Sequence, residues 1–368
     1  MKRRTFLKNA FQLSALSSLP ILQSHFSPSI KIKPYQVYWI HLEGAPIREV
    51  FDFWPDPYNQ FSITELEHKK EKLSLKFGEY LLPKLWKENP QSKFLLNHWL
   101  SVRGIALNGP HLKQSRSSWF RIKEDPEKSI IESFNESFQS AQLGSAKIYS
   151  LDGLTSSLYE PLLKNQIQEL KSGQLKELFK VWKDEANQRK KLNPLQLGII
   201  RSPSPISKNF EDYDRWDQST KEEYLKFYDG LIKELTQFAL YLDQLDQFQH
   251  SALLITSDRR KVPTSLNRDP ELEAVWEGGN FSLISGALNG PVVLGDIYRE
   301  HPKYKESYPM TWGASPHPYS PAHVHQLIMD LCLAGQQSGN YNPREENPWV
   351  VPRSLQGLYI KGLMGRVI

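Results

Sequence analysis

Ser251-Ala-Leu-Leu-Ile-Thr-Ser257, seven residues with an uninterrupted apolar centre, follow a long amphipathic segment and together with it decide the fold class of this chain. Apolar side chains recur at helical spacing through residues 220–246, which predicts one long helix with a wide apolar stripe. The stripe consists of Leu225, Tyr228, Leu231, Ile232, Leu235, Phe238, Ala239, Leu242 and Leu245. A helix that leads into a short apolar strand is typical of an α/β layer, where helices cover a parallel sheet. We therefore expect an α/β fold with a mostly parallel central sheet flanked by helices.

Other segments supply the remaining elements of this sheet. Residues 155–192 are helical by period and rich in Lys, Glu and Gln, which indicates a helical insertion or a cap. Ser320-Pro321 is expected to begin a last helix whose residues Val324, Leu327, Ile328, Leu331 and Ala334 point inward. Strands are expected at residues 35–42, 94–96, 195–200, 281–285 and 291–295.

The first eight residues, Met1-Lys-Arg-Arg-Thr-Phe-Leu-Lys8, resemble a twin-arginine export signal. A short apolar stretch follows, and no acidic residue precedes Glu43. This stretch is too short and too polar for a membrane-spanning helix. An ordinary secretory leader that begins with two arginines is the alternative. We predict a signal at residues 1–30, a single domain at 31–368, the twin-arginine translocase as the partner during export, and a periplasmic or extracellular location.

Charge and cysteine content exclude several classes of function. The formal net charge is +5, but four of the 46 basic residues stand in the first eight positions, and without them 42 bases face 41 acids. A near-neutral domain lacks the basic character of a nucleic-acid-binding protein. Cys332 is the only cysteine, so neither an internal disulfide nor a cysteine-based zinc or redox motif can form.

Two acidic residues come directly after predicted strands. Glu43 follows the first strand, and Asp258 follows residues 251–257. Sites in open α/β sheets gather at the carboxyl ends of the strands, and paired carboxylates suit a divalent cation. His317, in a predicted loop, could supply a third ligand. The expected cofactor is therefore none, or one zinc, manganese or calcium ion on these three residues; in the alternative, the carboxylates bind turn amides and arginines.

Arginines near the same strand ends favour an anionic ligand. Arg103 belongs to the segment 101–103, and Arg259 and Arg260 follow Asp258 directly. Guanidinium groups bind anions through two parallel hydrogen bonds. His111 could take part in such a site or could be a loop residue that only forms hydrogen bonds. Arginines of this kind also hold carboxylates at protein surfaces, and that alternative stays open.

Several segments, in order, resemble the exported DUF1501 family, whose sheet is similar to that of the alkaline phosphatase and sulfatase superfamily. The matching segments are His41-Leu-Glu-Gly-Ala-Pro46 with Phe51-Asp52 and Pro55, Val102-Arg103-Gly-Ile with His111, Ala252-Leu-Leu-Ile-Thr-Ser-Asp258-Arg-Arg260 with Pro263-Thr and Asn267, Gly278-Gly279-Asn280 through Ser285-Gly286, and Ser320 to Gly335. The resemblance implies an alkaline phosphatase-like fold and an ancestral metal-dependent ester hydrolase.

The chain departs from the family pattern at residues that carry chemistry. Ile47 stands where the family has a serine, Arg259 stands where phosphatases and sulfatases have a metal-binding histidine, and residues 274–276 replace an Asp-His-Trp. Isoleucine cannot act as a nucleophile, and arginine cannot bind a cation. The resemblance therefore implies an envelope protein that binds an anionic ligand or a protein partner at a decayed pocket. The alternative is a metal-dependent phosphate- or sulfate-ester hydrolase in which water is the nucleophile.

Overall fold

The fold is described from a computed structural model of the chain. The chain divides into two units, residues 1–32 and 33–368, and all described residues belong to the second unit. The structure describes residues 34–43, 54–55, 74–77, 80–83, 86, 91–106, 119–120, 128–151, 163, 167–170, 174–188, 193–201, 217–257, 278–288, 292–294 and 321–333.

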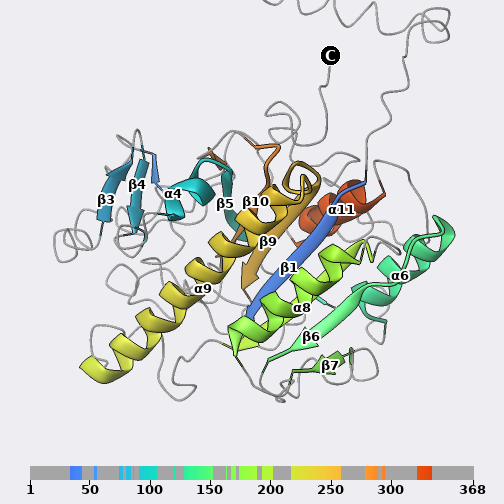
Figure 1. Cartoon of the computed structure of the whole chain (residues 1–368), viewed down its shortest axis with the longest axis horizontal. Coiled ribbons are helices and arrows are strands. Elements are labelled where there is room, and N and C mark those ends of the chain that lie inside the picture. The colour runs from blue at the N-terminus through green and yellow to red at the C-terminus, as the bar shows by residue number, and fades with distance from the viewer. Residues whose placement is uncertain are drawn as a thin grey trace, which may run out of the picture. The chain divides into compact units, whose positions relative to one another are not determined.

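A sheet with the strand order β11-β5-β10-β9-β1-β8-β6-β7 forms the centre of this unit (Figure 1). Its strands are β1 (Gln36–Glu43), β5 (Trp99–Ala106), β6 (Lys147–Ser150), β7 (Ile167–Glu169), β8 (Leu195–Arg201), β9 (Ser251–Ser257), β10 (Gly278–Ile284) and β11 (Val292–Leu294). Neighbouring strands are parallel, except that β10 runs antiparallel to both β5 and β9. The prediction of a mostly parallel central sheet is confirmed.

Strand β1 lies inside the sheet, between β8 and β9, and separates two apolar cores. Val37 and Trp39 pack into the first core, and Tyr38 and Ile40 pack into the second. Successive side chains of a strand point to opposite faces, so each face of β1 is covered by its own layer. This explains why four consecutive residues of the strand, Val37 to Ile40, are apolar or aromatic rather than alternating with polar residues.

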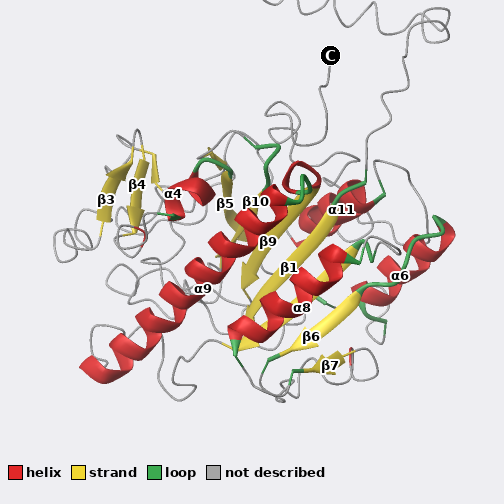
Figure 2. Cartoon of the chain, in the orientation of Figure 1, coloured by secondary structure: helices red, strands yellow, loops and turns green. Residues whose placement is uncertain are grey.

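Helices cover both faces of the sheet (Figure 2). The helices are α4 (Ser92–Leu96), α6 (Ile130–Ser140), α8 (Leu175–Asn187), α9 (Gln218–Gln244) and α11 (Pro321–Cys332), with a 3-10 turn, η4, at Phe248–His250. Side chains of α6 and α11 belong to the first core, and side chains of α4, α8 and α9 belong to the second. A small antiparallel sheet, β2-β4-β3, comprises β2 (Trp54–Pro55), β3 (Ser74–Phe77) and β4 (Tyr80–Pro83). In the described part of the chain, no helix has the length and apolar composition that a membrane span requires.

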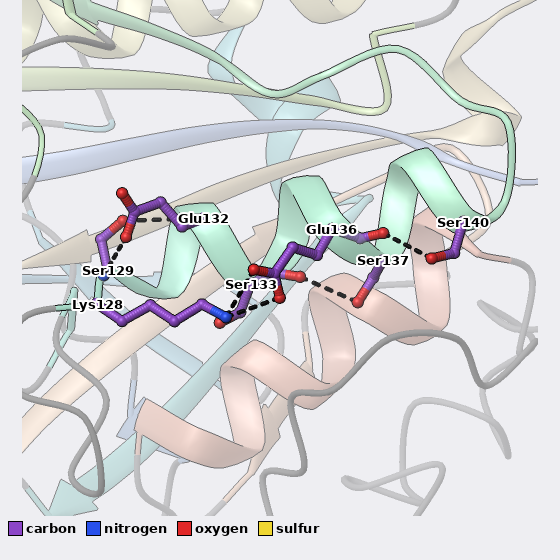
Figure 3. Close-up of polar contacts among 7 residues, drawn as sticks. All are labelled: Lys128, Ser129, Glu132, Ser133, Glu136, Ser137 and Ser140. Atoms are coloured by element: carbon purple, nitrogen blue, oxygen red, sulfur yellow. Dashed lines mark hydrogen bonds and ion pairs between the residues drawn. The ribbon is translucent and has the colours of Figure 1, made fainter.

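Helix α6 begins with a capping box, drawn in Figure 3. The backbone N–H of Glu132 donates to Ser129 Oγ at 3.2 Å, and the backbone N–H of Ser129 donates to Glu132 Oε2 at 2.8 Å. The two bonds satisfy N–H groups that have no partner within the helix. Lys128 Nζ also contacts both carboxylate oxygens of Glu136 at 2.7 Å, which links the residue before the cap to the second turn.

The long helix and the last helix are confirmed, and one predicted strand is wrong. Residues 94–96 belong to α4, and the strand begins only at Trp99. The apolar run Phe94-Leu-Leu96 suggested a strand, but Ser92, Leu95 and Leu96 are the buried positions of α4. Their i, i+3, i+4 spacing is that of one helical face.

Residues 155–192, expected to be a helical insertion, include β7 and α8 among their described residues. Helix α8 packs closely on β8 at Gly198, where a Cβ atom would lie 2.6 Å from Leu178 Cδ2 and 3.4 Å from Trp182 Cζ2. The absence of a side chain at Gly198 thus lets α8 approach the sheet. The division of the chain into a signal and a single domain with an insertion stays a prediction.

Candidate functional site

The carboxyl ends of β1 and β9 lie side by side in the sheet. Leu42 pairs with Ser257 in the parallel register, so β1 and β9 end at the same edge of the sheet. Glu43 is buried, with 4% of its surface exposed. Asp258 is the residue after Ser257, and it lies outside the described residues. The topology thus brings the ends of the two strands together, as the sequence predicts.

Arg201 is a further charged residue at this edge that the sequence analysis did not select. It is the last residue of β8 and the direct register partner of Glu43. Leu195, Leu197 and Ile199 of β8 pack into the first core, and strand alternation places Arg201 on that same face. Trp39 packs into the first core, so the odd-numbered residues of β1, which include Glu43, lie on this face as well. The signal in the sequence was an arginine directly after the predicted strand 195–200.

The other predicted site residues are placed only in part. Arg103 lies in β5, where it pairs with Asn280 of β10. Strand β5 runs in the same direction as β9, because β10 is antiparallel to both, so the end of β5 reaches the same edge of the sheet. His111, Arg259, Arg260 and His317 lie outside the described residues. Among the residues that the structure describes, no three histidines, cysteines or carboxylates are grouped so as to hold a metal ion.

A buried aromatic cluster lies below this edge on the first face of the sheet; it consists of Trp39, His41, Trp119, Phe120, Thr256 and His325. Trp39 Nε1 donates a hydrogen bond of 2.7 Å to Thr256 Oγ1, because an indole nitrogen can only donate. His41 Nδ1 lies 2.9 Å from the same hydroxyl. Thr256, one residue before the end of β9, therefore joins two side chains of β1 to β9 and holds the two strands together near their carboxyl ends.

Helix α11 contributes two buried histidines to this side of the sheet. His325 Nε2 donates to the backbone oxygen of Trp119 at 3.1 Å, since a carbonyl oxygen can only accept. Burial lowers the pKa of His325 to about 4, and the bond to Trp119 opposes this effect only in part. Burial likewise lowers the pKa of His323 to about 4. Both imidazoles are therefore neutral at neutral pH, so neither contributes positive charge to the edge.

Comparisons with known proteins concern the fold only. No protein-family model matches the chain, and no curated protein matches it. Among solved structures, Ps i-CgsB in complex with k-i-k-neocarrahexaose matches with a TM-score of 0.49 at 9% identity, over 91% of this chain and 77% of that chain. A protein in the alkaline phosphatase superfamily from Vibrio parahaemolyticus matches with a TM-score of 0.45 at 9% identity, over 93% and 74% of the two chains.

The lipoteichoic acid synthase LtaP from Listeria monocytogenes matches with a TM-score of 0.42 at 9% identity, over 82% of this chain and 72% of that chain. The order and directions of the described strands confirm the α/β fold class that the sequence predicts. The similar solved structures include a protein in the alkaline phosphatase superfamily. Because no family model matches, the resemblance to the DUF1501 family stays a prediction.

Proposed function

We propose that the chain is an exported envelope protein that binds an anionic ligand, or an anionic group of a protein partner, at the carboxyl edge of its sheet, with little or no catalytic activity. The observation that carries this proposal is the register of β8, β1 and β9. It aligns Arg201 with Glu43, and it pairs Ser257, the last residue of β9, with Leu42; three charged residues follow Ser257 in the sequence. Those following residues are Asp258, Arg259 and Arg260.

The charge at this edge favours an anion over a cation. Arg103 and Arg201 belong to strands that end there, and in the sequence Arg259 and Arg260 follow within three residues of the end of β9. These four arginines outnumber the two carboxylates Glu43 and Asp258. Guanidinium groups form paired, charge-assisted hydrogen bonds with phosphate, sulfate and carboxylate oxygens. Buried Glu43 would then orient a neighbouring arginine rather than bind the ligand itself. The absence of a hydroxyl at Ile47 supports binding without covalent catalysis.

A metal-dependent phosphate- or sulfate-ester hydrolase is the second candidate, and the burial of Glu43 beside the end of β9 favours it. In that case one zinc, manganese or calcium ion would be held by Glu43, Asp258 and His317. The residues fit such an ion in chemistry, because carboxylate oxygens and an imidazole are ligands that these metals accept. The ion would activate a water molecule, and the arginines would orient the ester oxygens.

Calorimetric titration with inorganic phosphate and inorganic sulfate tests the binding proposal. Arg201→Gln removes one guanidinium from the edge and should weaken binding by about tenfold, which corresponds to about 1.4 kcal/mol. Lys233→Gln is the matched control, because it removes one positive charge from the exposed side of α9, where Lys233 pairs with Asp229. Equal loss in both variants would mean that only net charge matters. No binding by the wild-type chain would refute the proposal.

Elemental analysis of protein purified without chelators separates the two candidates. About one metal ion per chain in the wild type, lost in Asp258→Ala, would favour the hydrolase and would justify assays with phosphate and sulfate esters. Export is tested separately by cell fractionation of the double substitution Arg3→Lys, Arg4→Lys. Retention of this variant in the cytoplasm supports the twin-arginine route, whereas unchanged export would refute it.

A further inference from the structure

The second face of the sheet carries polar side chains inside an otherwise apolar layer. Tyr38 of β1 and Gln196 of β8 are register partners. The neighbouring residues Leu195 and Leu197 pack into the first core, so strand alternation turns Gln196 to the second face together with Tyr38. The ring of Tyr38 lies 5.2 Å from the ring of Trp182 on α8. All three side chains have no exposed surface.

These three side chains hold polar atoms that lack hydrogen-bond partners in the structure as described. The atoms are the Tyr38 hydroxyl, Trp182 Nε1, and both Nε2 and Oε1 of Gln196. A buried amide without any partner is rare, because folding removes its water and returns nothing. Three adjacent groups in this state therefore indicate a shared polar occupant of the layer.

The charges around the three groups indicate that this occupant is neutral. Glu185 lies on α8 one turn after Trp182, and it accepts hydrogen bonds from Lys147 Nζ and, at 3.1 Å, from Asn193 Nδ2. Burial raises the pKa of Tyr38, and the negative charge of Glu185 raises it further, so the hydroxyl stays protonated. The negative charge of Glu185, which acts on Tyr38, disfavours an anion in this layer. The indole N–H, the hydroxyl and the amide N–H groups are donors, and they disfavour a cation.

We propose that a structural water molecule is bound between Tyr38, Trp182 and Gln196, beneath α8. A water molecule can accept from the indole and the hydroxyl while it donates to Gln196 Oε1. Buried waters in proteins have two to four such polar partners. The site would join β1, β8 and α8 by polar contacts in a layer that is otherwise held by apolar packing. It lies on the opposite face from the buried aromatic cluster, so it is independent of the proposed ligand site.

Nuclear magnetic resonance of the full chain, with 15N label in tryptophan, tests this site. We expect a cross-peak between the Trp182 indole proton and the water signal, with the sign of a long-lived internal molecule. The Trp182 signal is assigned by its loss in Trp182→Phe. Gln196→Met keeps the length of the side chain but removes both polar atoms that Gln196 offers to the water, so the cross-peak should fall below detection. Tyr38→Phe removes one partner of the water and should weaken the cross-peak without abolishing it, because the indole and both polar atoms of Gln196 still hold the molecule.

Three results would overturn the proposal. The first is the absence of a cross-peak in the wild type, and the second is an unchanged cross-peak in Gln196→Met. The third is a cross-peak that disappears only in Tyr38→Phe, because the cross-peak would then arise from exchange of the Tyr38 hydroxyl proton with water. Urea unfolding gives a second measurement. A dry layer predicts that Gln196→Met unfolds at higher urea than the wild type, whereas a water-bridged layer predicts the reverse. If Gln196→Met does not fold, the spectra of the wild type and of Tyr38→Phe still show whether a long-lived water molecule lies beside the Trp182 indole.

Discussion

Replacing Thr256 with valine should destabilise the protein strongly although the two side chains have nearly the same shape. The change removes the acceptor of the 2.7 Å bond from Trp39 Nε1 and the partner of His41 Nδ1 at 2.9 Å. All three residues are buried, so water cannot replace the lost hydroxyl. Each buried group that loses its partner costs about 1–3 kcal/mol, so the free energy of unfolding should fall by about 2–6 kcal/mol.

Thr256→Ser is the matched control, because serine keeps the hydroxyl and loses only a methyl group. The loss of one buried methyl costs about 1 kcal/mol. Urea unfolding of the wild type and both variants, followed by tryptophan fluorescence, measures the two effects. Valine should lower the free energy of unfolding more than serine does. If valine is as well tolerated as serine, the hydroxyl does not hold β1 to β9, and our account of how the carboxyl ends are fixed is wrong.

Three further predictions concern stability. Acid should destabilise the fold, because His323 and His325 have pKa values of about 4 when folded, against 6.5 when unfolded. As the pH falls below 6.5 the unfolded chain binds protons first, so each histidine lowers the free energy of unfolding by about 2 kcal/mol at pH 5, which urea unfolding at several pH values measures. His325→Gln should make the free energy of unfolding depend less steeply on pH. A dependence as steep as that of the wild type would contradict this prediction. Gly198→Ala should lower the free energy of unfolding by about 1–3 kcal/mol, because the added methyl group clashes with α8. Gly230→Ala should raise it by about 0.5–1 kcal/mol, because the nearest atom to the added methyl group is 3.9 Å away. Thermal unfolding of the two variants should therefore give shifts of opposite sign. Ser129→Ala should cost about 0.5–2 kcal/mol by removing the cap of α6, and unchanged stability would show that the cap has no net effect.

Periodicity was sufficient to predict the elements whose environment is uniform along their length. Helix α9 and strand β9 match their predicted segments because one is amphipathic throughout and the other is buried throughout. Helix α4 was missed because a helix of five residues is too short for a period to be visible. The antiparallel direction of β10 also left no trace in the sequence. It depends on pairing with β5 and β9, which lie far from each other along the chain.

The candidate site was predictable where it depends on strand ends and not where it depends on register. Glu43 could be selected because an acid directly after a buried strand is conspicuous in a sequence. The pairing of Arg201 with Glu43 could not, because the neighbour of β1 in space is separated from it by more than 150 residues. The structural roles of Thr256 and His325 could not be predicted for another reason. Their roles come from contacts with Trp39 and Trp119, and no spacing in the sequence announces such contacts.

The reversed direction of β10 has a consequence for how this protein can evolve. Because β9 ends and β10 begins at the same edge, the twenty residues between them start and finish on the side of the sheet that carries Glu43. Such a link can lengthen, shorten or change composition without shifting the register of any strand. Substitutions and insertions between β9 and β10 can therefore change which residues are available at that edge while the paired strands keep their register.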